Sequence, residues 1–596
     1  MPSYAAPVDD ILFLLSDVLH WERHSNLPGF GEADMATVAA VLKEAAKLSE
    51  QVLQPLNLSG DREGCRRDAD GSVRTPTGFK EAYRAYADGG WVGLAADPAW
   101  GGQGLPYTLA AIVNEFAAAA NMAFTMYPGL TQSAIAAVST HASDELKRIF
   151  LPKMISGDWS GTMNLTEPHC GTDLGLLKTR AIRNDDGSYA IDGTKIFISA
   201  GEHDLCENIV HLVLARIEGA PTGTKGISLF IVPKFEVLAD GGLGPRNRLS
   251  CGAIEHKMGI HGNATCVLNY DGARGWLIGE PNRGLNAMFV MMNEARLGVA
   301  SQGLAQSEVA YQNATAYARE RLQGRSLSGA KAPNLPADPI IVHADVRRML
   351  LTIRAFNESA RALLIYASLQ ADIVRTTSDP TDRMKADDRL GLLTPVLKGV
   401  LTDLGFENAV LAQQVFGGHG YVGEYGMEQF VRDARIAMIY EGANGIQALD
   451  LVGRKLPKDG GRAITSFFEE ISACIAENTS EPTLKPFCDA LQEALAHLRE
   501  ATLWFLHNGM SNLDNVGAGS YDYMHLFGSV ALGYMWLRIA KAALLRKAQG
   551  VDVAKMDAKL RIGKFYCARM LPETGLRLAR IRAGAESLMT LPAELF

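Results

Sequence analysis

The sequence lacks an excess of positive charge and any long apolar run. Its 596 residues carry 58 Lys and Arg against 66 Asp and Glu, which gives a formal net charge of −8. General nucleic-acid binders are more often basic, so we expect no nucleic-acid partner. A membrane-spanning helix needs roughly 18 or more nearly uninterrupted apolar residues. No stretch of the chain approaches that length, and we therefore expect no membrane partner.

Paired cysteines are missing as well. The eight cysteines form no C-x-x-C pair, and their spacing fits neither a zinc cage nor a disulfide framework. We therefore expect no metal site and a reducing, cytoplasmic setting. The N-terminus, "MPSYAAPVDDILFLLSDVLHWERH", has a short apolar run that is flanked by acids and follows no basic region. This pattern argues against a secretion signal.

The hydrophobic pattern changes twice along the chain. Apolar residues recur at helical spacing up to about residue 155 and again after residue 285. Between these blocks lie short β-branched or aromatic runs that are separated by turn pairs such as Asp186-Gly187. These runs are at 187–199, 208–217, 225–235 and 265–270. The pattern predicts an α+β fold.

Five domains are predicted along the chain. They are an N-terminal extension (1–35), an N-terminal helical domain (36–160), a middle β-barrel or sandwich domain (161–284), a C-terminal four-helix-bundle domain (285–456) and an additional helical domain (457–596). In the bundle we expect helices at 285–324, with a break, at 390–416 and at 427–456. In the additional domain, the run "HLFGSVALGYMWLRIAKAALLRKAQ" is nearly all apolar. It must bury most of its surface, in this subunit or against a partner.

A glycine motif near residue 420 has two interpretations. "GHGYVG" (418–423) matches G-x-G-x-x-G, which in a dinucleotide fingerprint follows a strand and opens a helix. Here the preceding "LAQQVFG" has a helical pattern, so a glycine-rich corner where backbone packs closely on a ligand or another subunit is favoured.

Two segments of the β region carry groups that suit a flat cofactor. "LTEPHCGTDLG" (165–175) places hydroxyls, an acid and glycines where helix gives way to strand; an ordinary capped turn is the alternative. In "GTKIFIS" (193–199), the period of two places Phe197 and Ser199 on one strand face. There an aromatic can stack and a hydroxyl can hydrogen-bond, although a half-buried structural strand has the same pattern.

The helical bundle carries isolated charged candidates. Arg296 and Arg321 lie on one predicted helix, and arginine suits bidentate phosphate recognition; solvated surface arginines are the alternative. Glu441 lies between an apolar run and a Gly-Ala-Asn-Gly step in "IAMIYEGANGIQ". A carboxylate in an apolar site is a better base, whereas a surface glutamate near a helix start is the alternative.

Taken together and in this order, these segments resemble the acyl-CoA dehydrogenase family. The β-domain match consists of "LTEPHCGTDLG" and "GTKIFIS", and the bundle match consists of "NEARLGVASQGLA", "YARERLQGR" and "QQVFGGHGYVGEYGMEQFVRDARIAMIYEGANGIQ". The resemblance covers roughly residues 40–455. Five separate motifs in the right order make it specific.

The resemblance implies FAD-dependent α,β-dehydrogenation of an acyl-CoA thioester to the trans-2-enoyl-CoA. Glu441 matches the family's base, which takes the α-proton while the β-hydrogen leaves as hydride to flavin N5. The developing enolate must be stabilised, and such electrostatic stabilisation is usually the largest contribution to the rate. The resemblance assigns it to the backbone N–H of Glu441 and a flavin ribityl hydroxyl.

The resemblance also implies two sets of binding residues. Phe197 is expected to stack near the isoalloxazine, and Ser199 to bond near its N5–O4 edge. The full set expected for FAD is Met163, Leu165, Thr166, Gly171, Thr172, Phe197, Ser199, Arg321, Gln323, Gln414, Gly417, Gly418, Ala443 and Asn444. The set expected for the acyl-CoA is Thr172, Arg296, Tyr440, Glu441, Gly442 and Arg454.

Three features depart from the family pattern. "RLQGR" is shorter than the common Arg-x-x-Phe-Gly form, so Gln323 stands where an aromatic is usual. After the base, relatives often have Gly-Thr-x-Gln; here Ala443 precedes Asn444, which is a possible substitute for the threonine. Some relatives place the base directly before the helix arginine, and Ala295 at that position favours Glu441.

The flanking segments resemble a long bacterial subgroup of the family. This subgroup includes 3-methylmercaptopropionyl-CoA dehydrogenases of dimethylsulfoniopropionate breakdown and enzymes for ordinary fatty acyl-CoA. The resemblance therefore implies 3-methylmercaptopropionyl-CoA as substrate, with a medium- or long-chain fatty acyl-CoA as the alternative. Electron-transfer flavoprotein is the expected electron acceptor, and a homodimer is the expected assembly. An acyl-CoA oxidase and a flavin-bearing DNA-binding protein of the same fold are rival interpretations.

Overall fold

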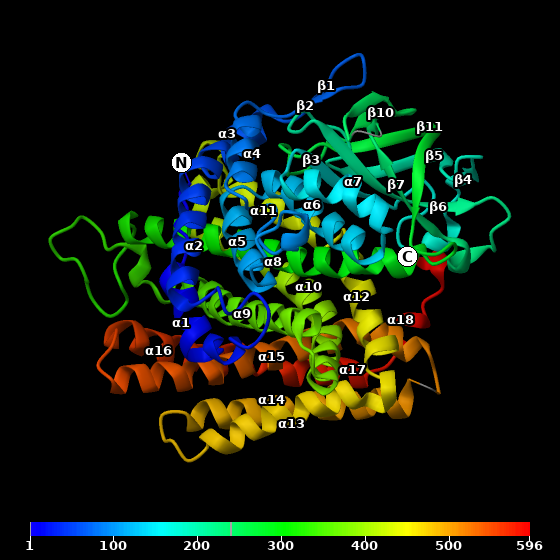
Figure 1. The fold of residues 1–596 in the computed structure, drawn as a ribbon. Helices are drawn as coiled ribbons and strands as arrows, with labels where there is room; N and C mark the ends of the chain where they lie inside the picture. Colours follow the sequence, from blue (N-terminus) through cyan, green and yellow to red (C-terminus); the bar gives the residue numbers. More distant parts are fainter. Residues whose placement is uncertain (1, 239–240, 510) are drawn as a thin grey trace. The chain divides into compact units, whose positions relative to one another are not determined.

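The computed structural model describes residues 2–238, 241–509 and 511–596, which form two compact units. Unit 1 is Met1–Ala40 with Val299–Phe596, and unit 2 is Val41–Gly298. Figure 1 shows the ribbon, coloured along the chain. The predicted order of helices, strands and again helices is confirmed. In the described ranges, no helix is both long and apolar enough to span a membrane.

Unit 2 begins with helices and continues with strands. Its main helices are α3 (Pro55–Glu63), α4 (Phe79–Asp88), α5 (Tyr107–Ala120), α6 (Met122–His141) and α7 (Asp144–Ile155). The seven strands of its main sheet are β3 (Trp159–Asn164), β4 (Arg180–Arg183), β5 (Tyr189–Ser199), β6 (Asn208–Ile217), β7 (Ser228–Pro233), β10 (Leu249–Ile254) and β11 (Thr265–Ile278). The four predicted runs correspond to β5, β6, β7 and β11.

The strands of this sheet close into a barrel. β11 pairs with β5, β5 with β4, β4 with β6, β6 with β7, and β7 returns to β11. β10 extends the ring beside β11, and β3 extends it beside β6 in parallel. Closure leaves no free edge in the ring. Of the two predicted alternatives, barrel or sandwich, the structure shows the barrel.

Buried apolar side chains fill the barrel. Tyr189 and Phe230 meet edge to face with ring centroids 5.0 Å apart, inside a cluster that includes Ile191, Val213 and Leu268. β6 has no exposed residue, and its first eight residues are all buried, which explains why six of these eight residues are apolar. The core thus provides a rigid support for the loops that leave β3 and β5.

Unit 1 is helical in its regular elements. Its long helices are α8 (Gly284–Glu320, from Val299 on), α9 (Ala344–Thr376), α10 (Pro380–Phe416), α13 (Arg462–Asn478), α14 (Lys485–Asn508), α15 (Asp514–Ala548) and α16 (Val553–Arg569). Shorter helices are α11 (Met427–Ala437), α12 (Asn444–Asp450) and α17 (Glu573–Arg582). α15 is the nearly all-apolar helix predicted to bury its surface, and its segment 523–537 is buried except for the half-buried Ser529.

The helix boundaries correct three expectations. α8 has no break and ends at Glu320. α10 begins ten residues earlier than predicted, because the Asp379 carboxylate caps the N–H groups of Thr381 and Asp382 and Pro380 opens the helix. The helix expected at 427–456 is interrupted after α11, and the interruption contains Glu441.

Candidate active site

Glu441 has a strained backbone in the loop between α11 and α12. α11 ends where the N–H groups of Ile439 and Tyr440 bond the carbonyl of Ile436, at 2.9 and 3.1 Å. Glu441 and Gly442 then both have positive φ, 56° and 84°. A non-glycine residue in this left-handed region costs about 1–2 kcal/mol. Such strain persists only where the surroundings hold it, and it clusters at functional sites.

Side chains and backbone within unit 1 hold this loop. The Gln447 amide Nε2 lies 3.2 Å from the carbonyl oxygen of Gly442 and 3.4 Å from that of Glu441. The N–H of Asn444 donates to the carbonyl of Met438 at 3.1 Å. These bonds close the loop and keep Glu441 in its unusual conformation.

Tyr440 precedes the carboxylate and packs into the same half-buried site. Burial raises the pKa of Tyr440 above its ordinary range, and the charge of Glu441 adds to this rise. The protonated phenol donates a short hydrogen bond to Gln302 Oε1 on α8. Glu441 is itself half-buried. Its side chain is therefore a partly shielded carboxylate on a rigid loop, which is an arrangement suited to accepting a proton.

Ala443 and Asn444 lie at the start of α12. Ala443 is its extended N-cap residue and offers no side-chain cap. The buried Asn444 amide donates to Asp403 Oδ1 (2.6 Å), Thr402 Oγ1 (2.9 Å) and the carbonyl of Gly399 (3.1 Å). Both amide hydrogens are therefore engaged inside the helical unit, so the structure gives Asn444 partners other than the FAD contact expected of it.

The residues expected to hold the FAD diphosphate and adenine lie at the ends of two helices. Tyr317 on α8 stacks on Phe416 at the end of α10, with ring centroids 4.2 Å apart. The Tyr317 hydroxyl also bonds His419 Nδ1 at 2.8 Å. This packing brings the two helix ends together. The predicted residues on them are all exposed, namely Arg321, Gln323, Gln414, Gly417 and Gly418.

The glycine motif belongs to this same corner. Residues Gly417–Tyr421 and Gly423–Tyr425 form short 3₁₀ turns directly after α10, with no strand before them. The strand that a dinucleotide fingerprint requires does not precede the motif. The close packing of this glycine-rich corner on a ligand or another subunit stays a prediction.

The two arginines expected near the acyl-CoA each contact a nearby residue of their own helical segment. Arg454 has an exposed side chain that pairs with Asp450 one turn earlier, at 2.6 Å. Arg296, which belongs to unit 2, is half-buried and approaches Asn293 Oδ1 at 3.3 Å. Their roles stay predictions.

In unit 2, the loop after β3 is fastened to β5. The N–H of Ile196 donates to the carbonyl of Thr166 at 2.9 Å, and Lys195 Nζ donates to the carbonyl of Leu165 at 3.0 Å. Met163 is buried at the end of β3. The structure thus brings these three predicted cofactor residues next to the strand that carries Phe197 and Ser199.

A buried ion pair anchors the same loop. Glu167 Oε1 accepts from Lys195 Nζ at 2.8 Å and from Thr179 Oγ1 at 2.5 Å, and Oε2 accepts from the N–H of Lys178 at 2.8 Å. Burial lowers the pKa of Lys195 to about 8, although the charge of Glu167 opposes that fall. Burial alone would raise the pKa of Glu167, but the charge of Lys195 and these hydrogen bonds hold it below its ordinary value.

Sequence reasoning missed the roles of Glu167 and Lys195. One signal was present: Lys195 occupies an inward position of β5, in phase with the apolar Ile191. A lysine at such a position needs a buried partner, and the quoted motif "LTEPHCGTDLG" offers two acids, Glu167 and Asp173.

A β-bulge in β5 sets the direction of Phe197. The pairing with β11 slips between Cys266 and Leu268, opposite Ile198 and Lys195, and Phe197 within the slip has φ 58°. The bulge reverses the inward phase, so that Ile198 is buried while the Phe197 ring is 60% exposed. Ser199 is half-buried on the same outward phase, and its carbonyl accepts from Thr162 Oγ1 at 2.7 Å.

The remaining predicted loop residues follow a tight turn. Glu167 and Cys170 exchange two backbone hydrogen bonds, of 2.9 and 3.1 Å, around the exposed Pro168 and His169. Gly171 and Thr172 then emerge exposed. The loop therefore presents a hydroxyl and backbone groups to solvent above a rigid anchor.

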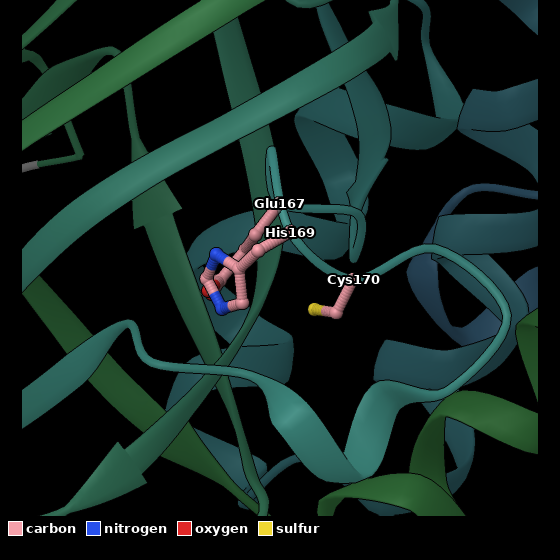
Figure 2. A group of neighbouring side chains, drawn as sticks. All are labelled: Glu167, His169 and Cys170. Atoms are coloured by element: carbon pink, nitrogen blue, oxygen red, sulfur yellow. The ribbon is translucent and has the colours of Figure 1, made fainter.

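Three side chains of this loop have the donor types of a metal site. Figure 2 shows Glu167, His169 and Cys170 on a single loop, and their ligand atoms lie within 4.8 Å of one another. The Glu167 carboxylate, however, is already bonded to the Lys195 cation, and His169 Nε2 bonds the carbonyl of Leu176 at 3.0 Å. Burial also raises the pKa of Cys170, which keeps its sulfur a thiol. This donor set stabilises the loop and does not fit a metal ion.

Comparison with known protein families covers most of the chain. Residues 36–158, 162–273 and 282–456 match the models described as acyl-CoA dehydrogenase N-terminal, middle and C-terminal domains. Residues 467–592 match a further model, described as acetyl-CoA dehydrogenase C-terminal like.

Individual relatives match over nearly full length. The 3-methylmercaptopropionyl-CoA dehydrogenase of Ruegeria pomeroyi is 41% identical over 99% of both chains. The broad-specificity linear acyl-CoA dehydrogenase FadE5 of Mycobacterium tuberculosis is 33% identical over 96% of both. Among solved structures, an acyl-CoA dehydrogenase of Bacillus anthracis complexed with FAD shares the fold. Its TM-score is 0.75 at 19% identity, with 93% of this chain and 89% of that chain covered.

Proposed function

This chain belongs to the acyl-CoA dehydrogenase family, the FAD-dependent oxidoreductases that act on acyl-CoA thioesters, and we propose that its substrate is 3-methylmercaptopropionyl-CoA. The reaction would remove the α-proton and the β-hydride and give methylthioacryloyl-CoA. The supporting observation is the 41% identity to the Ruegeria pomeroyi enzyme across 99% of both chains, extensions included.

A medium- or long-chain fatty acyl-CoA is the second candidate substrate. It is favoured by the 33% identity to a relative named for broad specificity toward linear acyl-CoA. Because the two relatives share the same full-length architecture with this chain, a direct comparison of substrates is the deciding measurement.

Each unit, taken by itself, presents exposed groups that fit part of an FAD cofactor. Phe197 is a large aromatic ring kept 60% exposed by a strained backbone, next to the Ser199 hydroxyl, which suits a flat heterocycle with polar edges. In unit 1, the exposed Arg321 guanidinium and the exposed backbone of Gly417 and Gly418 lie on helix ends that Tyr317 and Phe416 bring together, and such groups suit a diphosphate. We propose that these residues hold FAD, which when bound accepts the hydride from the β-carbon.

Glu441 carries the proton transfer in this proposal. Its half-buried carboxylate takes the α-proton of the thioester. As that proton leaves, negative charge develops on the thioester oxygen, and the backbone N–H of Glu441 donates to it. The left-handed conformation at 441–442 turns this short segment out of the path of helix α11. Exclusion of water by Tyr440 and the bound acyl chain strengthens both interactions.

The test of the base is Glu441→Gln. This variant keeps the side-chain shape but cannot accept the proton, so we expect FAD and acyl-CoA to bind while flavin reduction falls by about 10²–10⁴-fold or more. Stopped-flow loss of flavin absorbance under anaerobic conditions measures this step. A variant that bleaches its flavin at near the wild-type rate would place the base elsewhere.

The test of the substrate is parallel turnover of three thioesters by the wild-type enzyme. We expect the highest kcat/KM with 3-methylmercaptopropionyl-CoA, a lower value with butanoyl-CoA and the lowest with octanoyl-CoA. Dominant turnover of octanoyl-CoA would overturn the first substrate and favour the second.

The electron acceptor and the assembly are proposals as well. We propose electron-transfer flavoprotein as acceptor and a homodimer as the assembly, in which the exposed Arg321 corner contacts FAD across the subunit boundary. Hydrogen peroxide produced at the rate of turnover would instead identify an oxidase. Light scattering coupled to size exclusion measures the mass of the assembly.

A further inference from the structure

A chain of buried polar groups begins at Asn444, three residues after Glu441. The Asn444 amide donates to Asp403 Oδ1 at 2.6 Å, and its Oδ1 accepts from Lys398 Nζ at 2.7 Å. Asp403 and Lys398 lie on α10 and are 2% and 0% exposed. Polar groups buried this deeply are costly unless they are hydrogen-bonded, so the amide, the carboxylate and the ammonium depend on one another.

The other oxygen of Asp403 is bonded by the additional C-terminal domain. Oδ2 accepts from the Tyr521 hydroxyl at 2.7 Å and from His525 Nε2 at 2.8 Å. Both residues belong to α15, the helix that carries this label in Figure 1. Burial alone would raise the pKa of Asp403, but the hydrogen bond and charge of His525 and the hydrogen bonds from Tyr521 and Asn444 hold the pKa below its ordinary value. The carboxylate is thus ionised and only accepts, so Nε2 of His525 carries the proton it donates.

The chain reaches the backbone of the Glu441 loop through Asn444. Its side chain is fixed by Asp403, and its own N–H closes the loop on the carbonyl of Met438 at 3.1 Å. The same turn of α12 carries Gln447, whose amide bonds the carbonyls of Glu441 and Gly442. A shift of Asp403 therefore acts on the Glu441 loop, whose strained backbone orients the Glu441 carboxylate.

α10 and α15 also approach closely enough to make this contact rigid. A Cβ on Gly528 of α15 would lie 2.7 Å from a methyl of Val400, and a Cβ on Gly399 of α10 would lie 2.3 Å from the sulfur of Met524. Both distances are shorter than a normal carbon contact. The two glycines allow the helices to meet beside the loop, and His525 follows Met524 directly.

We propose that Asp403, His525 and Tyr521 are positioning residues for Glu441, and that the additional C-terminal domain is thereby a working part of the active site. The proposal rests on the proposed role of Glu441 as the base. His525 and Tyr521 hold Asp403, Asp403 holds Asn444, and Asn444 fixes the loop in which Glu441 keeps its left-handed backbone. None of these three residues contacts the reacting atoms in this scheme.

The experiment compares single substitutions on α15 in the full-length, FAD-loaded enzyme. His525→Leu and Tyr521→Phe each remove one donor to Asp403, whereas His525→Gln retains an N–H at nearly the same place. Tyr523→Phe is the matched control: it removes one buried hydroxyl from the same helix, but that hydroxyl bonds Thr502 at 2.7 Å and has no link to Asp403. Each variant is measured with the thioester that the wild type turns over fastest.

The readouts separate positioning from general destabilisation. We expect His525→Leu to slow anaerobic flavin reduction by about tenfold, which corresponds to about 1.4 kcal/mol in the activation free energy, because Asp403 loses a donor and no longer holds Asn444 and the Glu441 loop in place. The Kd for the thioester and the FAD content should stay within about twofold of the wild type, so that the loss falls on the reduction step. Tyr521→Phe should lose less, and His525→Gln should recover most of the rate.

Several results would overturn the inference. One is wild-type flavin reduction in His525→Leu and Tyr521→Phe. Another is an equal loss of rate in Tyr523→Phe, or losses that follow FAD content or melting temperature across the variants, because either would make the contact merely structural. If His525→Leu does not fold, the comparison of the flavin-reduction rates of Tyr521→Phe and its control Tyr523→Phe decides the question. Glu441→Gln in the same assay tests the base separately: its retained activity would refute the proposed function whatever the α15 variants do.

Discussion

The loop of unit 2 at Leu165 and the loop of unit 1 at Glu441 reach a similar result by different means. Each loop is associated with a non-glycine residue that has positive φ. The Leu165 loop is bonded to the strand that carries Phe197 (φ 58°), and the other loop contains Glu441 (φ 56°). The unit 2 loop is held by a buried ion pair whose partners are 28 positions apart, on one strand and the loop before it. The unit 1 loop is held by an amide whose supporting carboxylate depends on a histidine 122 positions further along.

The difference teaches where each loop is vulnerable. The anchor of the unit 2 loop spans fewer positions and is charged, so a single lost partner leaves a buried charge. The support of the Glu441 loop is long-range and shared among several hydrogen bonds, so its weakening changes orientation before it unfolds the helices. Three substitutions test this contrast.

The largest expected effect is that of Lys195→Met. It leaves the Glu167 carboxylate buried beside its remaining donors, which are the N–H groups of Lys178 and Thr179 and the Thr179 hydroxyl. Breaking a buried pair on one side costs about 3–5 kcal/mol. We therefore expect a fall of about 3 kcal/mol in the free energy of unfolding, measured by denaturant titration with tryptophan fluorescence. The double variant Glu167→Gln with Lys195→Met should recover part of that loss. A fall below about 1 kcal/mol would show that the anchor is not the pair.

The pH dependence of the free energy of unfolding, compared between the wild type and Lys195→Met, provides a control for this anchor. Because the pKa of Lys195 in the folded state is lowered to about 8 from 10.5, the unfolded chain binds more protons between these values. Stability therefore rises with pH across that window. Lys195→Met lacks this titration, so the stability difference between wild type and variant should widen from pH 8 to 10.5. A difference that stays constant over this range would contradict the assignment.

A smaller effect is expected from Gly442→Ala. The substitution places a Cβ at φ 84°, which costs about 1–2 kcal/mol in the left-handed region. We expect slower flavin reduction, since the loop must relax around Glu441, with little change at the unit 2 loop. Gly445→Ala is the matched control: this exposed glycine of α12 has open space around it, and alanine there should stabilise by about 0.5–1 kcal/mol. Equal effects of the two would remove the role assigned to the strain.

The smallest effect on stability is expected from Phe197→Gly. Relief of left-handed strain offsets the entropy that glycine adds to the unfolded chain, so the free energy of unfolding should change by less than about 1 kcal/mol. FAD binding should nevertheless weaken by about 1 kcal/mol, because a stacking ring is lost. Ala200→Gly, at φ 54°, relieves similar strain without removing an aromatic. If both variants retain FAD equally, Phe197 does not stack on the flavin.

Much of the architecture could be predicted because its signals are local. The apolar periods of β5, β6 and α15 depend on neighbours a few positions away, and each element formed as expected. The predicted start of α10 was wrong because the apolar repeat does not mark the true start. The Asp379-Pro380 cap begins the helix before any apolar repeat. The break at Glu441 was missed because a strained residue opposes its local preference.

The sequence by itself determined the family, the order of helices and strands, and Glu441 as the expected base. Contiguous motifs carry that information, and their residues stay neighbours in any conformation of the chain. Only the tertiary structure decided that Glu441 is held in a left-handed conformation, that Glu167 pairs with Lys195 and that Asn444 bonds Asp403 and, through it, His525. These contacts join distant segments and exist only once packed helices and strands bury the polar groups. The hydrophobic periodicity of the sequence therefore could not predict them.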